Sequence, residues 1–176
     1  DSLFFLSENF VLTFAASYID AIFDDFKNGP CDRTFVPPAS DDCPIVNGGP
    51  ARVKDFTGRT PSGVPELAIT VSGTYTFDLT ENMTGYVRGE YIYEDAYQAT
   101  DAVPVEVPNA LRQVGTLNAS LGVKDSASGF SIMLWGRNIN DDEYIYTGFN
   151  VPGSPGSYAG YPVVPKMWGL TLSRDF

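Results

Sequence analysis

From Glu66 to Leu79, ELAITVSGTYTFDL, apolar and polar residues alternate along the chain. Alternate residues of a β-strand lie on the same face of the sheet. One face of this stretch would hold Leu67, Ile69, Val71, Gly73, Tyr75, Phe77 and Leu79, and the other would hold mainly threonine, serine and acidic side chains. An average strand has only about 5–6 residues. The stretch therefore predicts an unusually long strand with one apolar and one polar face.

Similar alternation recurs along the chain. It predicts further strands at 2–6, 10–26, 83–93, 116–124, 130–138 and 166–176. The connections alternate between short ones (7–9, 80–82 and 125–129) and long ones (27–64, 95–115 and 139–165). The fold class predicted is all-β, with about seven antiparallel strands.

The composition excludes several functions. The chain has 176 residues, a net charge of −11 and no histidine. An acidic chain is a poor partner for nucleic acid, which is bound by clustered Lys and Arg. Without histidine there is no Ser-His-Asp or Cys-His nucleophile and no histidine-bearing zinc site. No other convergent catalytic set is found, so we expect neither an enzyme nor a cofactor.

The two cysteines, Cys31 and Cys43, lie close together in a polar stretch of the chain. An even number of cysteines without metal-ligand neighbours favours a short-loop disulfide. Such a bond persists in an oxidising compartment.

The strand pattern has features of a transmembrane β-barrel. Such barrels combine apolar-out strands of about ten residues with tight turns at one end and long loops at the other. Aromatic residues near the predicted strand ends, such as Tyr91, Tyr93, Trp168 and Phe176, fit the girdles at membrane interfaces. A soluble sandwich does not require this alternation of connections.

Two motifs resemble a known family. Leu134 to Asp142, LWGRNINDD, resembles the NL-x-D segment on the penultimate strand of TonB-dependent outer-membrane receptors. The ending PKMWGLTLSRDF resembles the last strand of these receptors, and 65–78 and 108–123 look like preceding strands. The resemblance implies that 1–176 is the C-terminal part of the barrel of such a receptor. It would supply about seven of 22 strands, with the plug domain absent from this chain.

The resemblance also implies a location and partners. The receptor would lie in the outer membrane of a Gram-negative bacterium and take up a scarce nutrient such as a ferric siderophore, a cobalamin or an oligosaccharide. Its partners would be membrane lipid, the remainder of the barrel and plug, the TonB complex through the missing N-terminal part, and the barrel assembly machinery. That machinery reads a C-terminal signal to which Trp168, Leu170, Leu172 and Phe176 are similar, although Arg174 departs from it.

The predicted loop 139–165 supplies the candidate ligand contacts, Tyr144, Tyr146, Phe149, Tyr158 and Tyr161. These rings would stack on a sugar or a flat chelate, or else pack within the loop or at lipid headgroups. The acidic run Asp141 to Glu143 is either part of a calcium site or a solvated rim. The rim is favoured, because the run lacks the Gly-spaced Asp pattern of a calcium loop.

Two other functional classes stay open. One is a structural or interaction barrel in a surface assembly, without uptake. The other is a soluble carbohydrate-binding β-sandwich, which would bury its apolar faces against each other.

Overall fold

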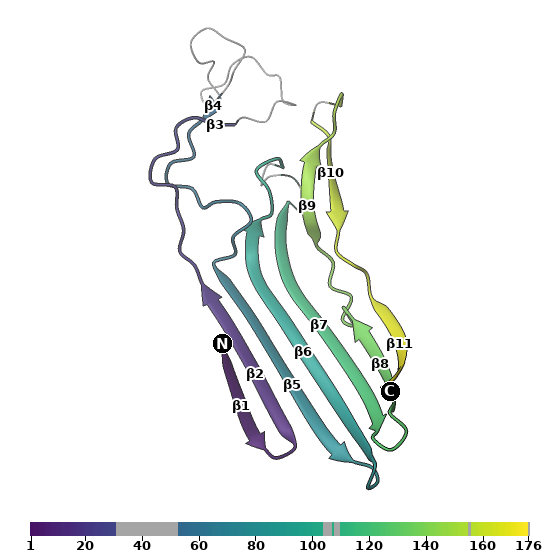
Figure 1. Ribbon diagram of the computed structural model, residues 1–176. Coiled ribbons are helices and arrows are strands. Elements are labelled where there is room, and N and C mark those ends of the chain that lie inside the picture. Colours follow the sequence, from purple (N-terminus) through teal and green to yellow (C-terminus); the bar gives the residue numbers. More distant parts are fainter. Residues whose placement is uncertain (31–52, 104–106, 108–109, 155, 176) are drawn as a thin grey trace.

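The computed structural model describes residues 1–30, 53–103, 107, 110–154 and 156–175. These residues form strands and no helix, so the all-β prediction is confirmed (Figure 1). The strands are β1 (Ser2–Ser7), β2 (Phe10–Tyr18), β3 (Gly29–Pro30), β4 (Val53–Lys54), β5 (Leu67–Asp78), β6 (Met83–Gln98), β7 (Leu111–Asp125), β8 (Phe130–Arg137), β9 (Ile145–Asn150), β10 (Tyr158–Pro162) and β11 (Met167–Arg174). Within the described part of the chain, no helix is long and apolar enough to cross a membrane.

Seven of the strands form one antiparallel sheet in the order β1-β2-β5-β6-β7-β8-β11. Each strand pairs with the next one along the chain, apart from the small β3–β4 and β9–β10 hairpins. The sheet does not close, because β1 and β11 are its two opposite edges. Short turns lie at one end of the sheet and long connections at the other (Figure 1). The predicted alternation of connections is therefore confirmed.

Some predicted boundaries are wrong. The strand expected at 10–26 ends at Tyr18. The aromatic residues that prolonged the pattern, Phe23 and Phe26, pack with Phe56, at ring centroid distances of 6.5 and 5.6 Å. They form a separate cluster near β3 and β4 instead of extending the sheet. Strands β6 and β7 are longer than predicted, and β9 and β10 form a hairpin inside the expected loop.

From β2 to β11 the pairing register places the alternating residues that the sequence predicted to be apolar on one side. For example, Val71 lies opposite Phe14 on one neighbour and Tyr91 on the other. We call this side the apolar face; it comprises Phe10, Leu12, Phe14, Ala16 and Tyr18 of β2, Leu67 to Phe77 (odd numbers) of β5, Met83 to Tyr93 (odd) of β6, Gly115 to Val123 (odd) of β7, Phe130 to Gly136 (even) of β8, and Trp168, Leu170 and Leu172 of β11. The opposite side is the polar face.

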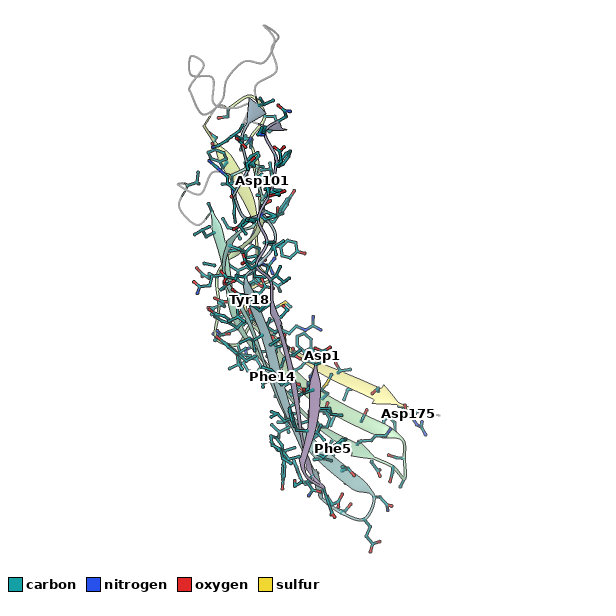
Figure 2. The ribbon with its side chains drawn as sticks, turned by 90° about the vertical axis from the view of Figure 1, so that its left-hand side faces the viewer. Asp1, Phe5, Phe14, Tyr18, Asp101 and Asp175 are labelled. Atoms are coloured by element: carbon teal, nitrogen blue, oxygen red, sulfur yellow. The ribbon has the colours of Figure 1, made fainter. Side chains whose placement is uncertain are left out.

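The described residues leave the apolar face uncovered. Figure 2 shows the sheet as a single layer, with no second layer packed against it. Central side chains such as Leu121 (47%) and Leu170 (61%) are largely exposed. Among the described residues the only buried apolar side chains of the core are Val103 and Val114, both near the long connections. The sheet therefore has no conventional hydrophobic core.

Four aromatic side chains lie over glycines directly opposite them on the neighbouring strand. The pairs are Phe77–Gly85, Tyr86–Gly122, Trp135–Gly169 and Trp168–Gly136. A Cβ on any of these glycines would come within 2.2–2.6 Å of the facing ring or, at Gly136, of Ile139. Such pairs cover the glycine backbone and fix the register of a sheet.

These pairs predict different effects for two glycines on the same face of β6. We expect Gly85→Val to destabilise the protein by about 1–3 kcal/mol, because the new side chain would overlap the Phe77 ring. Gly89→Val is the control, since a Cβ there meets nothing within 4 Å. Urea unfolding of the purified protein measures both, and equal effects would contradict the packing described here.

Candidate functional site

The candidate site lies at the end of the sheet that carries the long connections. There β6 and β7 meet the chain that leaves β8 and forms the β9–β10 hairpin (Figure 1). Two groups of side chains organise this region, one at the edge of β7 and one around Arg112.

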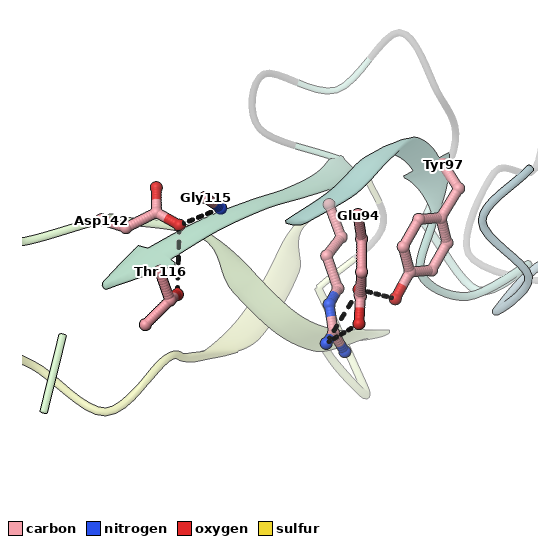
Figure 3. Close-up of polar contacts among 6 residues, drawn as sticks. Glu94, Tyr97, Gly115, Thr116 and Asp142 are labelled. Carbon is pink, nitrogen blue, oxygen red and sulfur yellow. Dashed lines mark hydrogen bonds and ion pairs between the residues drawn. The ribbon is translucent and has the colours of Figure 1, made fainter. Parts of the chain in front are cut away.

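Side chains replace a missing strand at the edge of β7. Strand β8 pairs with β7 only as far as Gly136 opposite Ala119. Beyond that point the Leu117 N–H donates to Asn140 Oδ1 (2.8 Å), and Asn140 Nδ2 donates to the Gly115 carbonyl (2.6 Å). The Gly115 N–H donates to Asp142 Oδ2 at 2.6 Å (Figure 3). These edge groups of β7 are thus paired without a neighbouring strand, in keeping with the strong tendency of backbone groups to find partners.

Asn138 holds this arrangement together. It is 3% exposed and has a φ of 49°, in the left-handed region that asparagine tolerates. Its Oδ1 accepts the Asp142 N–H (2.7 Å), and its Nδ2 donates to the carbonyls of Asp142 (2.8 Å) and Val164 (3.1 Å). We call Asn138, Asn140 and Asp142 the edge latch. It ends β8 and positions the segment that leads into β11.

The edge latch also uses part of the predicted acidic rim. Asp142 binds the backbone of β7 and accepts from the Thr116 hydroxyl at 3.3 Å, while Asp141 lies 4.0 Å from the Lys166 ammonium. Among the described residues no group of three or more acidic, cysteine or histidine side chains is arranged to hold a metal ion.

The second group surrounds Arg112 on the polar face of β7. Its guanidinium pairs with Glu94 at 3.1 Å. The same guanidinium carbon lies 5.6, 5.2 and 5.0 Å from the ring centroids of Tyr97, Tyr144 and Tyr146. Cations over aromatic faces are attracted by the ring electrons, the more so when shielded from water. Arg112 therefore fixes the start of the β9–β10 hairpin to the end of the sheet.

Tyr97 completes this group and lies beyond Tyr93, the last residue of β6 on the apolar face. Its hydroxyl donates to Glu94 Oε2 at 2.9 Å (Figure 3). Burial and this hydrogen bond raise the pKa of Tyr97 to about 12, although the Arg112 charge opposes the rise. Tyr97 is therefore a neutral hydrogen-bond donor at physiological pH.

The structure gathers the five predicted ligand-contact residues into one hairpin. Tyr144 precedes β9, Tyr146 and Phe149 lie on β9, and Tyr158 and Tyr161 lie on β10. Tyr144 and Tyr146 pack on Arg112, whereas the Phe149 and Tyr161 rings pack together at 5.6 Å. Packing on Arg112 or within the hairpin therefore accounts for one side of four of these rings. Ligand contact stays a prediction for all five residues.

Sequence reasoning missed Arg112, Glu94 and Tyr97 as members of this region. The available signal was a basic residue near the end of the predicted connection 95–115, which faces an aromatic-rich connection further along the chain.

The remaining predicted residues fall into two groups. Trp168, Leu170 and Leu172 lie on β11 with exposed side chains on the apolar face. Cys31, Cys43 and Phe176 lie outside the described residues.

The chain matches no protein-family model, and comparisons with curated proteins and with solved structures find no match. Its own surfaces are therefore the basis for assigning a function.

Replacing Asn138 tests the edge latch. Asn138→Gly removes the three side-chain hydrogen bonds but keeps the left-handed backbone accessible, and unpaired buried groups cost about 1–3 kcal/mol. Asn138→Ala should be about 1 kcal/mol worse, because alanine is strained at this φ. Asp141→Gly, at a φ of 59° with an exposed side chain, is the control and should be nearly neutral. Urea unfolding gives the order, and an Ala variant as stable as the Gly variant would contradict it.

Replacing Glu94 tests the Tyr97 contact. In Glu94→Gln the pKa of Tyr97 should fall from about 12 towards 10.0, although burial will keep it raised. The folded pKa lies above the unfolded value, so the contribution of Tyr97 to stability is present below pH 10.0 and is lost as pH rises towards about 12. NMR titration of labelled tyrosine rings measures the shift. Glu90→Gln, on the same face of β6, should leave Tyr97 unchanged.

Proposed function

We propose that the chain forms part of the wall of an outer-membrane β-barrel in a TonB-dependent receptor that takes up a scarce nutrient. The observation that carries this proposal is the continuous, uncovered apolar face on long antiparallel strands. A large exposed apolar surface marks contact with a membrane or another protein.

The length and composition of the apolar face suit a bilayer. A transmembrane strand needs about 9–11 residues, and β5, β6 and β7 have 12, 16 and 15. Its central side chains are mostly aliphatic, and none of the apolar-face residues is charged. Asp125 and Arg174, which continue the same side, lie next to the short turns or at the end of β11.

Aromatic residues border this face at both ends. Nearest the long connections on their strands are Tyr18, Tyr91, Tyr93 and Trp168, and nearest the short turns are Phe10, Tyr75, Phe77 and Phe130. Outer-membrane barrels carry aromatic girdles at both interfaces, with an aliphatic band between them. The apolar face has the same sequence of aromatic, aliphatic and aromatic residues along its strands, which supports a lipid-facing surface.

The polar face suits the interior of a barrel. Arg88 pairs with Glu90 at 3.0 Å and donates to the Thr74 hydroxyl at 3.2 Å. Glu90 also accepts from Asn118 Nδ2 at 3.2 Å. Barrel interiors are polar and hold water or a plug, whereas open hydrocarbon does not tolerate such groups.

The proposal requires further strands. The edges β1 and β11 do not pair with each other, and unpaired strand edges do not persist in lipid. We assign the closing strands to the rest of a 22-stranded receptor, which would also supply the plug and the segment that contacts TonB. Uptake itself rests on the resemblance of LWGRNINDD and PKMWGLTLSRDF to that family.

A charge placed on each face of β5 tests the membrane orientation. Val71 lies on the apolar face, and its neighbour Thr70 lies on the polar face opposite Ile92. We expect Val71→Lys to impair insertion into phospholipid vesicles, since a lysine on the lipid side costs about 2–4 kcal/mol near the bilayer centre. Thr70→Lys is the matched control and should insert normally. Equal insertion of the two variants would contradict a lipid-facing apolar face.

Uptake is tested in cells with and without the protein and with and without TonB. Labelled ferric siderophore, cobalamin and oligosaccharide are the probes. Accumulation of one probe that requires both the protein and TonB supports a receptor. If the protein inserts in the outer membrane and no probe depends on it, the structural barrel is favoured instead.

A further inference from the structure

A hollow of about 820 Å³ lies beside the outer ends of β6 and β7. The side chains that β6 and β7 contribute include Tyr91, Tyr93 and Leu111. Tyr91 and Tyr93 belong to the apolar face, and the odd number of Leu111 places it on the same side of β7. The opposite wall comes from the segments 138–144 and 163–166, which join the β9–β10 hairpin to β8 and β11 and which we call the stalk. Glu143 and Pro165 of the stalk line the hollow. The hollow therefore opens on the apolar side of the sheet, away from the polar face.

The edge latch creates this hollow. Asp142 and Asn140 hold the stalk against Gly115 and Leu117 through their side chains, so the stalk stands off from β7. A paired strand would lie about 4.8 Å from β7 and fill this space. The two segments of the stalk are hydrogen-bonded to each other, since the Val163 N–H donates to the Tyr144 carbonyl at 2.9 Å.

The lining favours an uncharged group rich in hydroxyls. None of the described residues that line the hollow is Lys or Arg, whereas Asp141, Asp142 and Glu143 are acidic, so the lining disfavours a phosphate. The Glu143 carboxylate is exposed and accepts hydrogen bonds only, which suits hydroxyl donors. The rings of Tyr91 and Tyr93 offer apolar surfaces with a polar tip, which suits the faces of a sugar ring.

The position of the hollow indicates that this ligand also has an apolar tail. It lies at the level of Tyr91 and Tyr93, where the apolar face ends, and Leu117 and Leu121 continue below it on β7. A lipid whose headgroup occupies the hollow would place its acyl chains along those leucines.

We propose that the hollow binds the uncharged sugar headgroup of a membrane glycolipid, whose acyl chains lie on the apolar face. This inference rests on the proposed function, because it requires the apolar face to be in a bilayer. It assigns a lipid site on the outside of the wall. Tyr144 lines the hollow as well and connects it to the cluster around Arg112.

Lipid retention tests this site in the intact receptor. The protein is inserted into phosphatidylcholine vesicles that contain monogalactosyl diacylglycerol or, in a parallel sample, phosphatidylglycerol. It is then extracted, and the retained lipid is quantified by native mass spectrometry. We expect retention of the glycolipid above both phospholipids. Excess free methyl galactoside should displace little of it, because the sugar alone lacks the acyl contacts.

Two variants and a control locate the binding. Leu111→Trp would fill the hollow from an exposed position, and Glu143→Ala would remove one of its carboxylate acceptors. Glu143→Ala should lower glycolipid retention about tenfold, as expected for the loss of one hydrogen bond to a charged group. Leu111→Trp should lower it at least as much, because the indole would occupy the space of the sugar. Glu81→Ala removes an exposed carboxylate in the β5–β6 turn at the other end of the sheet and should change nothing.

The failures are distinguishable. If the protein does not insert into vesicles, the proposed function fails and this inference fails with it. If it inserts but retains no excess of glycolipid, retains phosphatidylglycerol equally, or is unaffected by both variants, the glycolipid site alone is wrong. Full displacement by free methyl galactoside would make it a sugar site without a lipid requirement, which also overturns the proposal.

Discussion

The pairing register from β2 to β11 gives the sheet its two distinct faces. From β2 to β11, neighbouring strands pair without a register shift over all the rows that contain apolar-face residues. A slip of one residue would turn every side chain of a strand to the other face. Tight turns and the aromatic–glycine pairs hold the register, and only then do the separate apolar patterns merge into one face.

The tendency of backbone N–H and C=O groups to be paired explains the region between the apolar face and the long connections. Where β8 leaves β7, amide and carboxylate side chains take over the ladder of hydrogen bonds. The stalk of β9 and β10 therefore follows β7 without joining its sheet. This offset leaves a hollow on the apolar side and brings tyrosines to Arg112 on the polar side.

The strands were predictable from the sequence wherever apolar and polar residues alternate with a period of two. The strand at 66–79 was found almost to the residue, because one face alternates cleanly with the other. The end of β2 was missed, since Phe23 and Phe26 mimic the alternation but pack on Phe56. The β9–β10 hairpin was hidden among glycines and prolines. The aromatic residues of the site were found, but not Arg112, because its contacts to Tyr144 and Tyr146 join distant parts of the chain.

The proposed membrane wall ties the stability of this sheet to its surroundings. In water the exposed apolar face is unfavourable by about 25 cal/mol for each Å² that remains uncovered. In hydrocarbon that penalty is absent, but each unpaired N–H and C=O on the edges of β1 and β11 becomes costly instead. Neither environment suits the open sheet. In the proposed wall, insertion and closure with further strands would therefore occur together, and the long register of β5, β6 and β7 would be the template for both.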